Sequence, residues 1–451
     1  MSASGKMSDL LIVGAGIGGL SAAIALGQLN ERISIVEQSA QLGEVGAGVQ
    51  LGPNVTRILK SWGVYQSLDA YVYEPSSLEV HSALNGQILA TLPLGESFRD
   101  RYGASYHTVH RADLHAALLD CVVRGGYGDI HLNCKLSGLQ GHESGLQVLL
   151  EEKRINVHSQ RDASDEEFFS KKLYQGVIGA DGVWSKVRDI YFDTSKPHTH
   201  FGISADPSPS PGGVTFSGDL AYRSLVMQKM LPPSLRLSSV KVWLGPDMHL
   251  VQYPVRGGEW LNSVLILNTS RHTLKSGDRP LDVLSALDWT LHMSQPELAL
   301  NIHSIFPRTC PKIQDTLRAI DTWSVWPLMR SDPLTGPTQM ARGPVALLGD
   351  AAHPMLPYLA QGAGMAIEDA FEMGKQFTGR NSHQAHVHST QQLFMNYAHK
   401  RWLRNASVQK RALMNAEIFH AKQLVEWARD RSLKLFGAKL LDMPWLYGYK
   451  S

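Results

Sequence analysis

The feature that most limits the fold of this chain is a glycine-rich stretch near its N-terminus, GAGIGG at residues 14–19. An apolar run at residues 10–13 precedes it and has the length of a short buried strand. An alanine-rich segment at residues 20–29 is typical of a helix, and a second apolar run follows at residues 33–36. This strand–turn–helix–strand order predicts the opening of a doubly wound α/β domain.

The glycine spacing and the acid after the second strand predict a ligand. In such a motif Gly14 permits the tight turn, Gly16 lets a pyrophosphate approach bare backbone, and Gly19 lets helix and strand pack closely. The helix N-terminus adds partial positive charge. Glu37, followed by Gln38, lies 23 positions after Gly14, where a carboxylate can accept hydrogen bonds from ribose hydroxyl groups. We predict a dinucleotide site; the alternative is a tight turn without a ligand, and the pattern does not separate FAD from NAD.

Charge and cysteine content exclude several classes of function. Lysine and arginine total 43 and aspartate and glutamate total 41, so nothing in the charge balance indicates nucleic acid or an anionic membrane as partner. Three scattered cysteines are too few for a disulfide framework or a zinc site and fit a reducing compartment. Glycines interrupt the N-terminal apolar run, which therefore predicts neither a signal peptide nor a membrane span. We expect a cytoplasmic protein without stable membrane insertion.

Two later segments narrow the choice of dinucleotide. The sequence GADGVWSKVR at residues 179–188 follows a short apolar strand, and GDAAHP at residues 349–354 follows another. These segments resemble the DG and GD motifs of the flavoprotein aromatic hydroxylases, the single-component family typified by para-hydroxybenzoate hydroxylase. The stretches at residues 46–54 and 110–114 also resemble that family, so the likeness extends over residues 10–370. It implies FAD as cofactor, NADH or NADPH as co-substrate and O2 as oxidant.

The resemblance implies roles for individual residues. Asp350 would contact the ribityl or pyrophosphate region, Asp181 would hold the turn near pyrophosphate and nicotinamide, and Pro357 would lie beside the ring where oxygen reacts. A helix would open at residues 362–364 toward the flavin, because glycines beside a helix start form a nest that stabilises negative charge. Beyond the glycine-rich stretch, the positions assigned to the cofactor are Ala47, Gly48, Arg111, Asp181, Asp350, Gly362, Ala363 and Gly364.

A histidine and a tyrosine are the candidates for the chemistry. Within the family the likeness is greatest to salicylate hydroxylase, 3-hydroxybenzoate 6-hydroxylase and 6-hydroxynicotinate 3-monooxygenase, in which a pair spaced like His249 and Tyr253 faces the substrate ring. On a strand, residues i and i+4 point to one face, so both could reach one pocket. A phenolate is a far better nucleophile than a phenol, and a His249 with a pKa near 7 could take the proton. The alternatives are a structural hydrogen bond for His249 and core packing for Tyr253.

Other polar residues are weaker candidates for the substrate pocket. Tyr222 and Arg223 are candidates for substrate binding, because they lie on a strand that lines the active site in this family. Arg223 would face the flavin or an anionic substrate group; otherwise it is a surface arginine. Gln50 and Tyr358 complete the candidates for substrate binding. No metal site is expected, because the histidines in the segment at residues 383–388 lack acidic or cysteine ligands at suitable spacing.

The whole chain is expected to form an α/β fold: a doubly wound FAD-binding domain, a sheet-rich substrate domain and a helical C-terminal extension. Residues 151–172 and 204–213 have the composition of exposed loops. The basic residues at 400–411 are expected on the wet face of a helix. The predicted ranges are 1–77, 105–200 and 340–390 for FAD binding, 78–104 and 201–339 for the substrate domain, and 391–451 for the extension.

The predicted reaction is hydroxylation of a small phenolic aromatic, such as salicylate, with loss of CO2 if the attacked carbon bears a carboxylate. One alternative substrate is 6-hydroxynicotinate or a phenol of secondary metabolism. An alternative class is a flavin oxidase or dehydrogenase that inserts no oxygen, and another is a flavin-binding regulatory protein without activity. The expected assembly is a monomer or a homodimer.

Overall fold

The apolar runs around the glycine-rich stretch form the centre of a six-stranded sheet. In the computed structural model, which describes residues 9–43, 47–143, 145–151, 172–193, 213–268, 291–294, 306–378 and 389–449, β1 (Asp9–Val13) pairs in parallel with β2 (Arg32–Val36) and β11 (Gly176–Gly179). The register sets Val13 opposite both Val36 and Gly179. The three strands therefore end at one edge. The other strands of this sheet are β7 (Asp129–His131), β19 (Val345–Leu347) and β18 (Ala341–Arg342).

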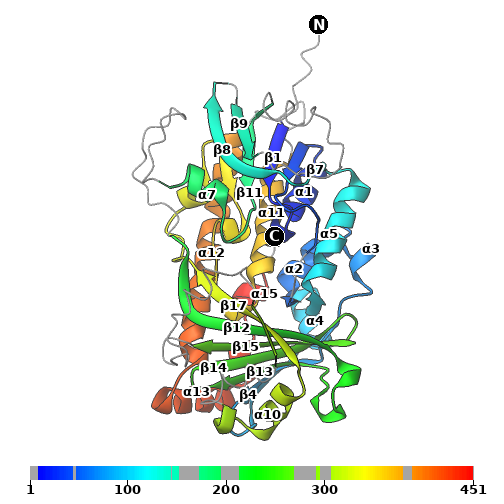
Figure 1. Ribbon diagram of the computed structural model, residues 1–451, viewed down its shortest axis with the longest axis vertical. Helices are drawn as coiled ribbons and strands as arrows, with labels where there is room; N and C mark the ends of the chain where they lie inside the picture. The colour runs from blue at the N-terminus through cyan, green and yellow to red at the C-terminus, as the bar shows by residue number, and fades with distance from the viewer. Residues whose placement is uncertain are drawn as a thin grey trace.

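Helices cover this sheet and build the largest core cluster (Figure 1). The first, α1 (Ile17–Gly27), begins three residues earlier and ends two residues earlier than residues 20–29, because Gly16 caps it and Gln28 closes it. It contacts α5 (Arg111–Gly125) and α11 (Gly362–Phe377). Ten of its eleven residues are buried, which is why its sequence is apolar on all sides.

The regions predicted to be rich in strands form a second sheet of eight strands, which crosses the molecule below the first (Figure 1). All of its neighbouring strands are antiparallel except β13 and β4, which are parallel. In spatial order the strands are β16 (Leu291–Ser294), β17 (Thr322–Arg330), β12 (Thr215–Met227), β15 (Trp260–Asn268), β14 (Met248–Val255), β13 (Val240–Gly245), β4 (Ser77–Ser82) and β5 (Ile88–Pro93).

The two faces of the eight-stranded sheet pack against different partners. Along β12, Leu220 and Tyr222 belong to a cluster with α10 (Pro311–Arg318). Ala221 belongs instead to a cluster with Tyr358 and with Ala412 of α12 (Thr390–Phe419). Successive side chains of a strand point to opposite faces. The face that includes Ala221 is therefore the one turned toward the cofactor-binding half.

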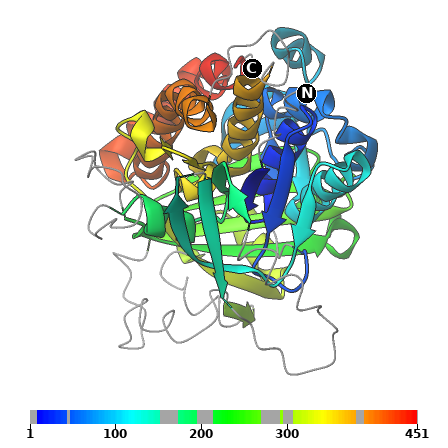
Figure 2. The ribbon, with the colours of Figure 1, turned by 90° about the horizontal axis from the view of Figure 1, so that it is seen from above.

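The C-terminal region is helical, as predicted, and its helices gather along one side of the molecule (Figure 2). The long helix α12 packs on α11 and on the six-stranded sheet, and it also contacts the short 3₁₀ helix η6 (Pro357–Leu359). The helices α13 (Gln423–Phe436), α14 (Ala438–Leu441) and α15 (Pro444–Tyr447) follow it. The fold class expected from the sequence is thus confirmed, while the division into three domains stays a prediction.

Shorter elements connect these layers. They are β3 (Gly48–Leu51), β6 (His107–His110), β8 (Lys135–His142), β9 (Gly145–Glu151), β10 (Leu173–Tyr174), α2 (Pro53–Ser61), α3 (Tyr65–Leu68), α4 (Glu96–Tyr102), α7 (Lys186–Tyr191), and the 3₁₀ helices η1 (Gln228–Met230), η2 (Pro233–Leu235), η3 (Phe306–Arg308), η4 (Pro337–Gln339) and η5 (Gly349–Ala351).

Among the described residues, no helix is both long and apolar enough to cross a membrane, and no group of three or more acidic, histidine or cysteine residues is placed to hold a metal ion. Most of the two predicted loops and all of residues 383–388 lie outside the described ranges.

Candidate active site

A cavity of about 370 Å³ opens where β2, β1, β11 and β19 end. The turns after these strands carry Glu37, Gly14, Asp181 and Asp350, so four distant parts of the chain meet there because parallel strands share one carboxyl edge. Its volume is in the range of cofactor and ligand sites. The predicted cofactor residues that line it are Gly14, Gly16, Glu37, Gln38, Arg111, Asp181, Asp350, Gly362 and Ala363.

Two glycines of the first turn have no room for a side chain. Gly14 has a φ of 102°, and a Cβ there would lie 2.5 Å from the carbonyl oxygen of Ala180. A Cβ on Gly19 would lie 1.9 Å from the carbonyl oxygen of Gly14. Both contacts are closer than real Cβ atoms come, so the turn and the close packing of helix on strand require glycine. Gly19 itself does not line the cavity.

Two helices direct their N-termini at this cavity. The helix α1 begins after Gly16 and α11 begins after Gln361; neither has a side-chain cap or an acidic residue in its first turn. The start of α11 at Gly362 agrees with the helix predicted to open there. Free amide groups and the positive end of the helix dipole attract anions. Both termini are therefore suited to the phosphates and the electron-rich edge of a flavin dinucleotide.

Glu37 braces the glycine turn as well as facing the cavity. Its carboxylate accepts hydrogen bonds from the backbone N–H of Ala15 (2.9 Å) and of Ser39 (2.8 Å). These bonds fix the carboxylate at the end of β2, at the edge of the cavity. The position is the one in which a ribose would be recognised.

Charged groups on the far side of the cavity lie close enough to affect each other. Burial raises the pKa of Asp350, and the neighbouring His353, Arg111 and Arg188 oppose that rise. Arg188 donates hydrogen bonds to the carbonyl oxygens of Ala351 (3.0 Å) and Val183 (2.7 Å). It thereby joins the segment at residues 179–188 to the segment at residues 349–354, a role that the sequence analysis missed although it named the residue's segment.

Asp181 holds the turn before α7. Its carboxylate accepts hydrogen bonds from the hydroxyl of Ser185 (2.5 Å) and from the backbone N–H of Lys186 (2.6 Å) and Val187 (3.1 Å). Burial raises its pKa, while these hydrogen bonds act in the opposite direction. The side chain is therefore fixed in place beside the cavity that it lines.

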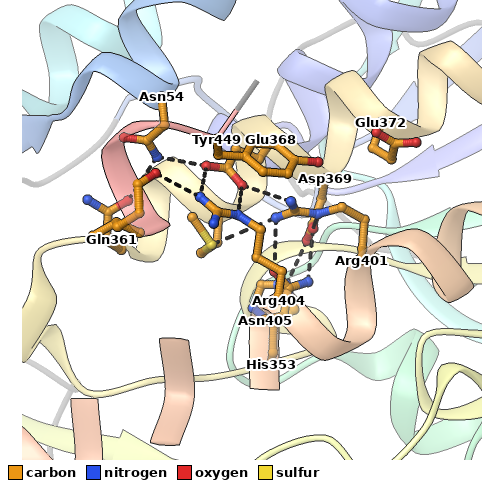
Figure 3. A network of polar contacts seen from close by, with 12 residues as sticks. Asn54, His353, Gln361, Glu368, Asp369, Glu372, Arg401, Arg404, Asn405 and Tyr449 are labelled. Atoms are coloured by element: carbon orange, nitrogen blue, oxygen red, sulfur yellow. Dashed lines mark hydrogen bonds and ion pairs between the residues drawn. The ribbon is translucent and has the colours of Figure 1, made fainter. Parts of the chain in front are cut away.

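A buried network of charges holds α11 in position behind the cavity (Figure 3). Arg401 of α12 contacts Glu368 and Asp369 of α11 at 2.7 Å each, and all three side chains are fully buried. Glu368 also accepts hydrogen bonds from Asn54 (2.7 Å) and from Arg404 (2.7 Å). The expectation that the basic residues at 400–411 form a wet helix face is wrong for Arg401, because the helix turns this side chain toward two carboxylates.

The same network reaches the turn after β19. Asp369 accepts a hydrogen bond from the backbone N–H of Gly349 (3.1 Å) and contacts Nε2 of His353 at 2.6 Å. Burial alone would raise the pKa of Asp369, but His353 and Arg401 hold it below its usual range. The segment that carries Asp350 is thus tied to two helices.

The strand β3 carries Gly48 and Gln50 between the cofactor-binding half and the second sheet. The backbone N–H of Gly48 donates to the side-chain oxygen of Asn262 (2.7 Å), and a Cβ on Gly48 would lie 2.4 Å from the ring of Tyr253. The Tyr106 hydroxyl donates to Gln50 (2.5 Å). Ala47 accepts a backbone hydrogen bond from Arg111 (3.1 Å). Tyr253 and the predicted cofactor residues 47 and 48 therefore adjoin, although the three do not line the cavity.

Of the three predicted cofactor residues on α11, Gly364 is the one that does not line the cavity. A Cβ there would lie 2.9 Å from the Gln361 side chain and 2.9 Å from the Val55 side chain. This glycine allows α11 to pack closely on α2, a role distinct from the predicted contact with the flavin.

Arg223 is half-buried, with its Nε shielded from solvent, on the face of the eight-stranded sheet that is turned toward the cofactor-binding half. Burial lowers its pKa to about 10, with Arg111 acting in the same direction and Tyr253 opposing it. Its guanidinium lies 5.2 Å from the ring of Trp326. Its Nε has no hydrogen-bond partner among the described residues. Arg223 is therefore only partly exposed, and its assignment to the substrate pocket stays a prediction.

Tyr222 requires a correction. It was predicted to contact substrate together with Arg223, but adjacent residues of β12 point to opposite faces of the sheet. Tyr222 is 1% exposed and belongs to the cluster with Trp243, Ile313 and Trp323. It packs between the sheet and α10, away from the other candidates.

His249 and Tyr253 lie on one face of β14, as the strand period requires. His249 is 1% exposed, and its ring centroid lies 4.8 Å from that of Tyr358. Nδ1 of His249 lies 2.8 Å from Nε2 of His420, the residue that caps the C-terminus of α12. Burial, and then His420, lower the pKa of His249 well below its ordinary value. The expectation of a pKa near 7 is wrong, and His249 is a neutral imidazole.

Tyr358 links η6 to the second sheet. Its hydroxyl donates a hydrogen bond to Asp219 of β12 (2.7 Å), and burial and that carboxylate raise its pKa. Pro357 is the first residue of the same 3₁₀ helix and does not line the cavity. The sequence analysis missed Asp219, Asn262 and His420, since each is recognised only by what it touches across the fold.

Comparison with known proteins bears directly on this cavity. The model of a family described as FAD binding domain matches residues 7–203 and 302–412. A 3-hydroxybenzoate 6-hydroxylase of Polaromonas naphthalenivorans (strain CJ2) is 29% identical over 444 residues, which cover 98% of this chain and 96% of the relative. A 6-hydroxynicotinate 3-monooxygenase of Bordetella bronchiseptica is 29% identical over 378 residues, 83% of this chain and 85% of the relative.

Solved structures share the fold. A salicylate hydroxylase substrate complex has a TM-score of 0.73 at 20% identity and covers 99% of this chain and 97% of its own. HpxO of Klebsiella pneumoniae in complex with FAD and uric acid also has a TM-score of 0.73 at 20% identity, with 96% and 94% covered. The family match extends over more than half of the chain and includes the strands and helices that form the cavity. This chain belongs to the FAD-binding-domain family and is a flavoprotein monooxygenase.

Proposed function

We propose that this enzyme uses NADH or NADPH and O2 to hydroxylate a small phenolic aromatic that carries a carboxylate, such as salicylate or another hydroxybenzoate. The observation that carries the proposal is Arg223, a half-buried guanidinium whose Nε is shielded from solvent and which has no carboxylate partner among the described residues. A buried charge without a partner is costly. A carboxylate on the substrate would supply the missing opposite charge and would orient the ring through a bidentate contact.

The relatives support a hydroxylated aromatic acid as the substrate class. The names of several of them specify 3-hydroxybenzoate or 3-amino-4-hydroxybenzoate. A substrate held by Arg223 on β12 would lie on the same sheet face as His249 and Tyr253 of β14, because the register sets Arg223 opposite Val264 of β15 and Val264 opposite Val251, midway between these two residues. If the attacked carbon bears the carboxylate, CO2 leaves in the reaction. A second candidate, 6-hydroxynicotinate, is favoured by the named relative and also carries a carboxylate.

The residues present fit FAD, since two uncapped helix N-termini and glycine backbone surround one cavity. Bound FAD supplies the redox chemistry that activates O2 with electrons from the nicotinamide. The chain supplies position, charge and proton transfer. Arg223 binds the substrate carboxylate, Tyr253 positions the ring, and Nε2 of His249 accepts the phenol proton. The lowered pKa keeps this imidazole unprotonated and able to accept at neutral pH, but it also makes the ring a weak base, so the proton must be passed on rather than held.

The test is a panel of hydroxybenzoates, hydroxynicotinates and matched phenols without a carboxylate. Nicotinamide oxidation is followed, and products are identified by mass. We expect kcat/KM for the acids to exceed that for the matched phenols by about 30-fold or more, because losing a buried charge pair costs about 2–5 kcal/mol. Arg223→Met should remove this preference, while Arg318→Met on the exposed face of α10 should retain it.

Each rival function predicts a different result in the same assay. An oxidase or dehydrogenase would consume nicotinamide without a product heavier by one oxygen atom. A regulatory flavoprotein would bind FAD but show no aromatic-stimulated oxidation. Equal rates for acids and phenols would remove the assigned role of Arg223 while leaving hydroxylation itself in place.

A further inference from the structure

We propose that His420 of the C-terminal helical layer carries the substrate proton away from His249, so that the two rings act as a proton relay from the active site toward the carboxylate of Asp219. The proposal rests on the hydroxylation proposed above, and it adds a residue outside the region matched by the FAD-binding-domain family, which ends at residue 412. We call His249 and His420 the histidine pair. They are 171 residues apart in sequence and 2.8 Å apart in space.

The hydrogen bonds of the histidine pair point in one direction. Within the described part of the chain, Nδ1 of His249 has the single partner Nε2 of His420, and Nε2 of His249 has none. Nδ1 of His420 lies 4.0 Å from Oδ1 of Asp219, a gap that one water molecule can bridge. A carboxylate near Nδ1 favours the tautomer of His420 with its proton on Nδ1, which leaves Nε2 free to accept. His249 then donates from Nδ1 and keeps Nε2 free for the substrate.

The proton step follows from these tautomers. The phenol O–H bond breaks as Nε2 of His249 takes the proton. The Nδ1–H proton of His249 passes to Nε2 of His420, and His420 releases its own Nδ1–H proton to Asp219 or to water. One proton enters and one leaves, so neither ring holds a net charge at the end. A relay of this kind suits buried imidazoles, in which a lasting positive charge would be costly.

Charged groups face the pair from each element packed against it. Asp219 of β12 lies beside Tyr358 of η6, whose hydroxyl already donates to that carboxylate. Asp247 precedes β14 and forms an ion pair with Lys422, whose side chain is 39% exposed. Arg429 of α13 donates to the carbonyl oxygen of Phe419 (2.9 Å). The two acidic groups thus neighbour His420, where they can receive or pass on a proton.

Electrostatics keep both rings unprotonated between turnovers. Burial lowers the pKa of His420 to about 4; Asp247 opposes this effect and Arg429 adds to it. Burial of Asp219 raises the pKa of its carboxyl, although hydrogen bonds from Tyr358 and Asn268 act in the opposite direction. Asp219, the final proton acceptor, is therefore a stronger base than an exposed aspartate.

The test uses the FAD-loaded enzyme and 4-hydroxy-3-nitrobenzoate, a hydroxybenzoate whose phenolate absorbs visible light. Rapid mixing at a pH below the pKa of this nitrophenol, where the free ligand is protonated, gives the rate at which phenolate appears on binding, and equilibrium titration gives the Kd. We expect His420→Gln to slow phenolate formation at least tenfold and to change the Kd less than twofold. His249→Gln should slow it at least as much. The matched control is His142→Gln, which alters an exposed histidine on the β8–β9 hairpin.

A purely structural role for His420 would change both quantities together, and that result would overturn the relay. An unchanged rate in His420→Gln with a slow rate in His249→Gln would also overturn it, as would a wild-type complex that forms no phenolate. Asp219→Asn is the second variant if His420→Gln folds poorly; it should slow phenolate formation at least threefold. Nitrogen-15 NMR of histidine-labelled enzyme gives an independent test, since a proton on Nε2 of His420 in the free enzyme would contradict the assigned direction.

The relay and the proposed function can fail separately. Normal phenolate formation without an oxygenated product would leave the relay and remove the hydroxylase assignment. If the wild-type enzyme forms an oxygenated product but His420→Gln forms phenolate at an unchanged rate, the hydroxylase assignment stands and the relay is refuted.

Discussion

The cofactor cavity and the C-terminal helical layer are built in different ways. The cavity is formed largely from backbone at the ends of four parallel strands, and each contributing turn is a short local motif. The C-terminal layer acts through side chains that meet partners far along the chain, such as Arg401 with Asp369 and His420 with His249. Backbone requirements select glycine at fixed positions, whereas side-chain partnerships between distant helices leave no local pattern. The first kind of site can therefore be read from a sequence and the second cannot.

The largest expected effect comes from the C-terminal layer. Arg401→Met removes the fully buried cation shared by Glu368 and Asp369 and leaves them only Arg404 and His353 as partners, so the free energy of unfolding should fall by about 3–5 kcal/mol. Chemical denaturation measures it. Lys400→Met, one residue away on an exposed position, should change it by less than about 0.5 kcal/mol. Equal effects of the two variants would show that the buried network is not what holds α12 to α11.

The glycine turn should be nearly as sensitive. In Gly19→Ala the new Cβ would lie 1.9 Å from the Gly14 carbonyl oxygen, so α1 must shift away from β1. We expect a loss of about 1–3 kcal/mol or more in stability, and loss of FAD from the purified enzyme. Flavin absorbance and the Tm measure these effects. Gly43→Ala, with no atom within 4 Å of its Cβ, is the control. A yellow, stable Gly19→Ala protein would contradict the packing argument.

The buried carboxylate of Asp369 should make stability depend on acid pH. Its pKa in the folded protein is lowered, so its contribution is complete above the ordinary carboxyl range near pH 4 and is lost as the pH falls further. Each unit of lowering corresponds to about 1.4 kcal/mol. The unfolding free energy of Asp369→Asn should therefore fall less steeply with decreasing pH below pH 4 than that of the wild type. Parallel pH profiles would refute the assignment.

The smallest effect is expected at the junction between the two regions. Tyr358→Phe removes the hydrogen bond to Asp219, with an expected loss of about 1–2 kcal/mol in stability. FAD binding should be unchanged, because Tyr358 does not line the cavity. Tyr71→Phe, at a residue that is 47% exposed, is the matched control for denaturation. A colourless Tyr358→Phe protein would mean that this tyrosine supports the cofactor site directly.

The sequence by itself determined the cofactor half of this protein. The runs at residues 10–13 and 33–36, the spacing of Gly14 and Gly19 and the acid Glu37 specify one strand–turn–helix–strand unit, because strand period, helix caps and glycine geometry are all local properties. The segments that follow β11 and β19 were recognised by their resemblance to the motifs of a known family. The i, i+4 spacing correctly placed His249 and Tyr253 on one face.

Only the tertiary structure decided which side chains meet. Tyr222 and Arg223 are neighbours in sequence and were both candidates for the substrate pocket, yet their side chains lie on opposite faces of the sheet. Arg401 reads as a solvent-exposed basic residue until α12 packs on α11 and buries it between two carboxylates. The pKa of His249 depends on burial and on His420, neither of which is a property of residues near position 249. Solvation and long-range contact set these features, and both exist only after the chain has folded.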